Sequence, residues 1–212
     1  MKIKRFRLWK PVEVALLVGL VLSILSGVWA VKTQNRLAEQ VVRLHVLANS
    51  DSPEDQALKL EVRDAVLQKS TELLKGSTSR QEAEVILRRN LPALRKVSEE
   101  QIAAQGYAYP VDVVLEVTDF PTKAYDGFSL PAGKYLALRV LIGAAAGQNW
   151  WCVAFPPLCT TATADVAVTA LAAGMEPEDV RLIMEEDGYV LKFKAVELWQ
   201  NLRRMGGLPA VF

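Results

Sequence analysis

The sequence predicts an α+β fold: an antiparallel sheet of four or five strands with helices packed on one face, preceded by an N-terminal signal peptide or membrane anchor. Three observations lead to this prediction. A basic cluster and an apolar run open the chain. Two long segments with helix-start signals follow the first strand-like run, and segments of alternating apolar residues follow those helices. This order is typical of an α+β domain.

The first ten positions carry five basic residues, and an apolar run of 18 residues follows from Val14 to Val31. As a signal peptide, this segment offers Val28-Trp29-Ala30 as a small-residue cleavage site. As a membrane anchor, it falls within the ~17–25 residues that span a bilayer. Both interpretations stay open. In either case we expect residues 1–31 to direct export and residues 32–212 to form an extracytoplasmic domain.

The charge balance argues against one class of partner. The chain has 25 basic and 24 acidic residues, for a net charge of +1. Proteins that bind nucleic acid usually carry a basic surface. We therefore expect no nucleic-acid partner.

A polar corner connects the first strand to the first helix. Alternation over residues 42–46 places Arg43 and His45 on one face of the strand, opposite three apolar residues. Ser52 and Asp55 form a capping box, with Pro53 at the first helical position. The polar residues of the corner are either local capping devices or a recognition surface.

The first helix should run from residue 53 to residue 75 and end at Gly76. A second helix begins after Ser79, is interrupted near residues 90–92 around Pro92, and resumes to about residue 105. Alternating residues then predict strands over 111–118, 135–142 and 150–155. The loop over residues 143–149 suits a hairpin, and a short helix should span 177–184. Neighbouring strand residues point to opposite faces, so the Trp150-Trp151 pair should be divided between the two faces of the sheet.

The two cysteines, Cys152 and Cys159, flank a proline pair that should turn the chain. In an oxidising compartment they can form a disulfide; otherwise they are buried free thiols. A zinc site is disfavoured, because two thiols and one distant histidine leave the usual set of four ligands incomplete.

Catalytic residues are scarce in this sequence. His45 is the only histidine, so any serine or cysteine dyad must use it. No phosphate-binding loop, metal-binding motif or dinucleotide fingerprint occurs, and we expect no cofactor. An extracytoplasmic hydrolase centred on His45 and Asp51 is the alternative to a binding protein.

Three blocks of sequence, residues 41–64, 126–140 and 147–159, resemble the stage II sporulation protein R family of endospore-forming bacteria. They occur in the order of that family. The segment 190–199 resembles its closing strand and helix, and the intervening residues 160–187 look like an insertion.

The resemblance implies a function. Proteins of this family are made in the forespore and exported into the space between the two membranes of the sporulating cell. There they activate a membrane-embedded aspartic protease, of the stage II sporulation protein GA type, that processes pro-sigma-E. This is the role of a ligand and not of an enzyme. We expect the partner surface at the corner and the adjoining helix, in His45, Asn49, Asp51, Asp55, Lys59 and Arg63.

Overall fold

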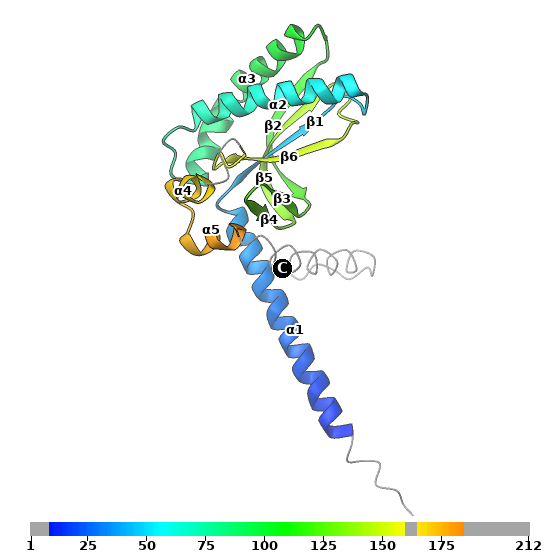
Figure 1. Ribbon diagram of the computed structural model, residues 1–212, viewed down its shortest axis with the longest axis vertical. Coiled ribbons are helices and arrows are strands. Elements are labelled where there is room, and N and C mark those ends of the chain that lie inside the picture. Colours follow the sequence, from blue (N-terminus) through cyan, green and yellow to red (C-terminus); the bar gives the residue numbers. More distant parts are fainter. Residues whose placement is uncertain (1–8, 160–164, 185–212) are drawn as a thin grey trace, which may run out of the picture.

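The computed structural model describes residues 9–159 and 165–184 (Figure 1). The helices in these ranges are α1 (Trp9–Ala38), α2 (Pro53–Leu73), α3 (Arg80–Ala104), α4 (Val166–Ala172) and α5 (Pro177–Met184). The strands are β1 (Val42–Leu47), β2 (Val111–Phe120), β3 (Lys123–Tyr125), β4 (Phe128–Leu130), β5 (Gly133–Ile142) and β6 (Asn149–Phe155). The α+β class is confirmed. The closing strand and helix expected over 190–199 lie outside the described residues.

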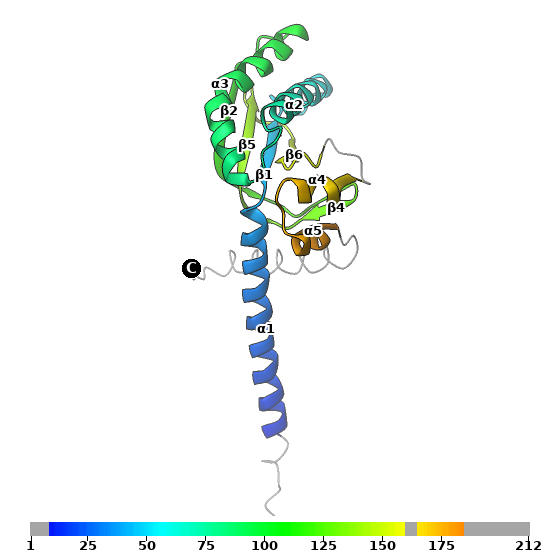
Figure 2. The same ribbon diagram turned by 90° about the vertical axis from the view of Figure 1, so that its left-hand side faces the viewer.

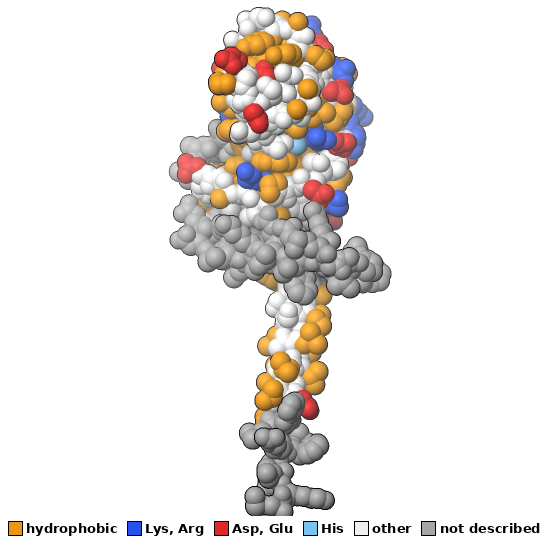
Figure 3. Space-filling model, turned by 90° about the vertical axis from the view of Figure 1, so that its right-hand side faces the viewer, with side chains coloured by type: hydrophobic (Ala, Val, Ile, Leu, Met, Phe, Trp, Pro, Cys, Tyr) orange, Lys and Arg blue, Asp and Glu red, His pale blue; other side chains and the backbone are white. Residues whose placement is uncertain are grey.

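Helix α1 projects from the domain as a single rod, and apolar side chains cover its shaft (Figure 3). Its segment Pro11–Ala38 has a mean hydropathy of 2.5, and none of that apolar window is buried in the domain. Within the described ranges this is the one helix long and apolar enough to cross a membrane. The helix continues without a break beyond Ala30, where the sequence suggests a cleavage site.

The four-stranded sheet is mixed, with the strand order β2-β5-β1-β6. β1 pairs with β5 in parallel and with β6 antiparallel, while β2 pairs with β5 antiparallel. The expectation of a purely antiparallel sheet was therefore wrong, and so was the hairpin over residues 143–149. The loop between β5 and β6 crosses the end of β1, because β1 lies between these two strands. It spans about 10 Å, or two strand spacings. The long connection from β1 to β5 contains α2, α3, β2 and the β3–β4 hairpin, and parallel pairing requires such a crossover in place of a tight turn.

One face of the sheet packs against α2 and α3, as expected. Leu44, Val46, Leu138 and Val140 on this face are fully buried. They share a core with Val62 of α2 and with residues of α3. The alternation of β1 thus correctly predicts which of its residues face the helices.

The other face of the sheet is covered as well, which the sequence did not indicate. The β3–β4 hairpin, α4, α5 and the last turns of α1 contribute to a second core there. Leu37 of α1, Leu130 of β4 and Ile183 of α5 are among its most buried members. The polar-looking face of β1 therefore lies inside the domain over much of its length.

Helix α3 is continuous through Pro92, against the predicted interruption. Proline removes one hydrogen bond from the helix interior. Leu87 and Leu94, on either side of Pro92, are both fully buried in the first core. Tertiary packing on both sides of the proline holds the two halves of α3 in one helix.

Candidate functional site

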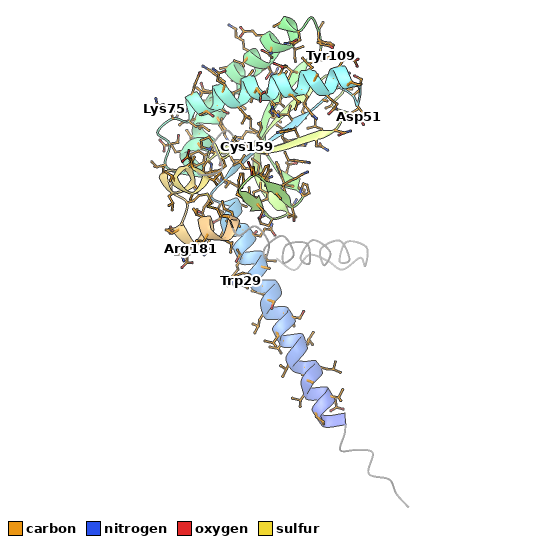
Figure 4. All side chains as sticks on the ribbon, in the orientation of Figure 1. Trp29, Asp51, Lys75, Tyr109, Cys159 and Arg181 are labelled. Atoms are coloured by element: carbon orange, nitrogen blue, oxygen red, sulfur yellow. A yellow bond between two sulfur atoms is a disulfide. The ribbon has the colours of Figure 1, made fainter. Side chains whose placement is uncertain are left out.

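The corner lies at the end of the domain opposite to α1. Asp51 and Tyr109 are at this end in Figure 4, whereas Arg181 and Trp29 are at the end from which α1 emerges. β1 begins a few residues after α1 and runs away from it. The parallel strands β1 and β5 both end at this far pole, and β6 begins there.

Asp55 organises the interior of the corner. Its backbone N–H donates to the Ser52 hydroxyl at 3.1 Å, which is the predicted helix cap. Its carboxylate accepts hydrogen bonds from Asn49 Nδ2 at 2.8 Å and from the Ser50 hydroxyl. The Ser50 and Asn49 hydrogen bonds, with a smaller effect of Tyr109, lower the pKa of the Asp55 carboxyl. Asp55 is almost completely buried, so it supports the corner from within.

Asn49 and Asp51 hold the loop that follows β5. Asn49 Oδ1 accepts a hydrogen bond from the Ala144 N–H at 2.9 Å, and Asp51 Oδ1 accepts one from the Gln148 N–H at 2.7 Å. Gly143 has a φ of +59°, and a Cβ there would lie 2.2 Å from Asn49 Oδ1. Only glycine allows this close approach. Asn49 and Asp51 therefore have structural partners, and Asp51 remains exposed.

Lys59 is not a surface residue, contrary to the expected mixed-charge patch. Its relative exposure is 4%. Its ammonium group donates to Gln56 Oε1 and to the Gln148 carbonyl at 3.0 Å. Burial lowers the pKa of Lys59, while Asp51 acts in the opposite direction. Lys59 thus ties α2 to the loop before β6.

Arg63 is more accessible and forms a different contact. Its guanidinium lies 4.3 Å from the centre of the Trp150 ring and pairs with Asp64 at 2.7 Å. Trp150 is 37% exposed, an unusual degree for a tryptophan in a strand. Arginine and tryptophan are enriched among the residues that dominate binding at protein interfaces.

His45 lies deeper, on the second face of the sheet. It is 5% exposed and its ring stacks on Trp151 at 3.9 Å. Its Nε2 is 2.7 Å from Asn149 Oδ1, and Arg139 Nε donates to its Nδ1 at 3.3 Å. These two bonds fit a neutral imidazole protonated at Nε2. Burial lowers the pKa of His45 to about 4, with Arg139 adding to the effect and Asn149 opposing it.

Arg43 is fully buried beside His45 on the same face. Its Nε donates to the Cys152 carbonyl at 3.0 Å, and its Nη2 donates to the Tyr125 hydroxyl at 2.6 Å. The Phe120 and Tyr135 rings lie 4.3 and 5.0 Å from the guanidinium carbon. Nη1 has no hydrogen-bond partner among the described residues. A buried arginine held by aromatic rings and neutral groups is the most unusual feature of this core.

The hydrolase hypothesis receives no geometric support from the hydrogen bonds of His45 and Asp51. The imidazole is engaged with Asn149 and Arg139, and the Asp51 carboxylate with the backbone of Gln148. Neither residue orients the other for proton transfer. Across residues 9–159 and 165–184, no group of three or more potential ligands could hold a metal ion.

Cys152 and Cys159 are joined by a disulfide, with 6.2 Å between their Cα atoms. This Cα distance is within the usual range for a disulfide. The bridge links the middle of β6 to the turn that follows it. Cys152 belongs to the first core and Cys159 packs against it, so the disulfide holds the turn against the sheet.

Sequence reasoning missed two parts of this site. The loop over residues 143–148 forms half of the corner, and its signal was the pair Gly143 and Gly147 flanking three alanines. The aromatic surroundings of Arg43 come from β2, β3 and β5, all distant in sequence. No local pattern announces an assembly of that kind.

The fold and the corner define an α+β domain carried on one apolar helix, with a polar pole far from that helix. The family model for stage II sporulation protein R matches residues 38–165, which include all six strands. The chain is 39% identical over 147 residues to stage II sporulation protein R of Bacillus subtilis (strain 168). That match covers 68% of this chain and 66% of the relative, just under two thirds of its length. No solved structure matches the chain. The chain belongs to the stage II sporulation protein R family.

Proposed function

We propose that this protein is an exported sporulation signal that activates a membrane-embedded aspartic protease of the stage II sporulation protein GA type. The protease then processes the pro-sigma-E precursor. The observation that carries this proposal is the family match over residues 38–165, which covers the sheet, the corner and the disulfide. The hydrogen bonds of His45 and Asp51 support a binding role over hydrolysis, because each group is engaged with a different partner.

The apolar helix α1 supports export. The five basic residues that precede its apolar run are expected to stay in the cytoplasm of the forespore. We propose that the domain enters the space between the two membranes, where it is released or stays anchored by residues 14–31. The Cys152–Cys159 disulfide fits that oxidising side of the membrane.

The activation is tested by co-expressing the full chain with the protease and its precursor in a non-sporulating host. Cleavage of the precursor should depend on this chain and disappear when a catalytic aspartate of the protease is replaced. Precursor that stays intact, with the chain folded and exported, would overturn the proposal. Cleavage that survives replacement of the protease aspartate would instead indicate a hydrolase.

We propose that the protease contacts a distal patch formed by Asp51, Arg63, Asp64, Gln148 and Trp150. These side chains surround the corner, which the half-buried Asn49 and the buried Asp55, Lys59 and His45 hold in shape. β1 has six residues, so the corner stands about 20 Å beyond the end of α1. A partner anchored in the opposite membrane would meet this pole first. The Arg63–Trp150 pair supplies the residue types expected at the centre of such an interface.

The patch is tested by reversing Arg63 to Glu, with Arg88→Glu as the matched control. Both arginines lie on long helices and pair with a carboxylate, although the Arg63 side chain is less exposed than that of Arg88. Loss of the contact with Trp150 should lower the free energy of unfolding by only about 0.5–1 kcal/mol. Arg63→Glu should abolish precursor cleavage, whereas Arg88→Glu should leave it unchanged. Equal cleavage with both variants would show that the interface lies elsewhere.

A further inference from the structure

The two edges of the four-stranded sheet are not equally protected. β2 and β6 are its outermost strands (Figure 2). β2 carries exposed acidic side chains at Asp112, Glu116 and Asp119. Arg88 of α3 also donates to the Leu115 carbonyl of β2, at 3.4 Å. Charged side chains and covered backbone groups keep an edge strand from pairing with another chain. The first three residues of β6 carry no charge, so they lack this protection.

The second part of β6 is covered along its outer edge. The Val153 N–H donates to Cys159 Sγ at 3.1 Å, so this amide points away from β1 and toward the turn that the disulfide holds. Arg43, which extends from β1, donates to the Cys152 carbonyl at 3.0 Å, so that carbonyl lies on the β1 side of the strand. Residues 152–155 are all buried. The turn after β6 therefore closes this part of the edge.

The first part of β6 leaves its outward backbone groups open. Backbone groups of alternate residues point to the same side of an antiparallel strand, so those of Trp151 and Asn149 point away from β1, as the Val153 N–H does. Those of Trp150 face Val46, its register partner on β1. Within the described part of the chain, no hydrogen bond reaches the outward groups of Asn149 and Trp151. Asn149 and Trp150 are exposed and Trp151 is half-buried, so a partner can approach these groups.

We propose that an extended segment of the partner protease adds to the sheet as a further strand beside residues 149–151. The proposal rests on the proposed function and names how the partner is held next to the distal patch. In this mode of binding, hydrogen bonds between main chains give affinity and the neighbouring side chains give specificity.

The two tryptophans of β6 define what the incoming segment contacts. The Trp150 ring lies on the face of α2, next to Arg63. The Trp151 ring lies on the opposite face and stacks on His45. Neighbouring side chains of an extended segment point to opposite faces. One apolar side chain of the partner therefore contacts Trp150, and the next one contacts Trp151.

A second copy of the chain fits this edge less well than a separate partner. Two identical strands related by two-fold symmetry pair antiparallel. β6 runs antiparallel to β1, and β1 follows α1, so pairing of two β6 strands would direct the two α1 helices in opposite directions. Two copies retained in one membrane cannot adopt that arrangement. A partner in the opposite membrane has no such restriction, because β6 begins at the far pole.

Trp150 and Trp151 provide a matched pair for the test, because their backbone amides point in opposite directions. Amide hydrogen exchange is followed on the full chain in detergent micelles, with isotope-labelled tryptophan and the disulfide intact, and is read by NMR after quenching. Trp151 is the one tryptophan that follows another tryptophan, so labelled tryptophan carbonyls identify its signal. Labelled asparagine carbonyls identify Trp150 in the same way, because it follows Asn149.

The free chain should exchange the Trp151 amide about tenfold or more faster than the Trp150 amide. The detergent-solubilised protease should slow exchange at Trp151 about tenfold or more and leave Trp150 unchanged. Slow exchange at Trp151 in the free chain would overturn the proposal, because another part of the chain or a second copy would already occupy the edge.

Precursor cleavage, measured in the same mixture, separates this proposal from the proposed function. Cleavage with unchanged exchange at Trp151 would overturn the added strand and leave the activation intact. Slower exchange at Trp151 without cleavage would overturn the activation alone. Absence of both effects would overturn both proposals.

A pair of variants at Asn149 gives a second measurement. Proline is tolerated at the first residue of a strand and removes the outward N–H. Asn149→Pro and Asn149→Ala both lose the side-chain hydrogen bond to His45, so they differ mainly in the backbone. Both variants should retain slow exchange at Trp150, which reports that β6 is still paired with β1. Asn149→Pro should lower precursor cleavage several-fold relative to Asn149→Ala, and equal cleavage would contradict the added strand.

Discussion

Arg43 and His45 show how a strand that looks half-polar can be buried on both faces. Their side chains lie in a layer of aromatic rings, and their polar atoms, apart from Arg43 Nη1, find partners inside the domain. Alternation correctly assigned the two residues to one face of β1. It could not show that a hairpin and short helices cover that face, because those elements come much later in the chain.

The contacts of Arg43 predict that the domain tolerates an apolar substitution at this position better than a basic one. No carboxylate among the described contacts depends on its charge, so an apolar residue of similar length removes a buried charge and leaves only the Cys152 carbonyl and the Tyr125 hydroxyl without this donor. Arg43→Met should therefore lower the free energy of unfolding less than Arg43→Lys, since lysine keeps the charge and cannot hold both acceptors in a planar fork. Urea denaturation of both variants checks the order. A lysine variant as stable as the wild type would contradict it.

The lowered pKa of His45 predicts a loss of stability in mild acid. The unfolded chain binds a proton near pH 6.5, whereas the folded chain does so only near pH 4. Stability should therefore fall as the pH drops from 6.5 to 4, by at most about 3 kcal/mol. Urea midpoints at pH 7 and pH 5 should differ more for the wild type than for His45→Gln. The same pH dependence in both proteins would assign it to other groups.

At the scale of elements, the start of α2 and the loop after β5 form one unit. Asp55 accepts hydrogen bonds at the helix start, while Asn49 and Asp51 fasten residues 143–148. The cap, the turn and the loop therefore depend on one another. Local capping, which the sequence left as one of two interpretations, accounts for most of the buried residues of the corner.

Asp55→Asn tests this dependence. The amide keeps the shape, and its oxygen can accept both hydrogen bonds that reach Asp55 Oδ2, but the negative charge that strengthens them is lost. The free energy of unfolding should fall by about 1–3 kcal/mol at pH 7. Because the folded pKa of Asp55 is lowered, the difference from the wild type should shrink as acid protonates the wild-type carboxyl. Glu54→Gln, at an exposed position in the same helical turn, is the control and should change stability by less than about 0.5 kcal/mol.

The sequence predicted elements well and their pairing poorly, for a physical reason. Capping at Ser52 and Ser79 and the alternation over β2 are local properties, and both helix starts are where they were expected. Insertion of β1 between β5 and β6 depends on contacts across about 90 residues, which no local pattern encodes. For the same reason, the exposed Arg63–Trp150 contact and the buried Lys59 could be distinguished only in the folded molecule.

At the scale of the whole molecule, α1 makes the two ends of the domain different, because one end adjoins the helix and the other is far from it. One end carries α5 next to the helix (Figure 1), and the other carries Asp51 and the corner (Figure 4). This arrangement fits the proposed function, in which a partner anchored in the opposite membrane meets the corner.

Topology can be tested directly with a fusion. Alkaline phosphatase joined after Phe212 should be active, because the basic residues before α1 are expected to stay in the cytoplasm and the domain to be exported. Enzyme assays on intact cells measure this. A fusion that lacks residues 1–31 is the control and should be inactive, and an inactive full-length fusion of normal abundance would contradict export.

The central position of β1 also has a consequence for timing. β1 leaves the ribosome early, yet its two neighbours occupy residues 137–141 and 149–155. At synthesis rates of about 5–20 residues per second, β1 waits roughly 5–20 s for a partner. The four-stranded sheet cannot close during that interval. A strand order that delays closure of the sheet suits the proposed export, because a chain is translocated before it folds.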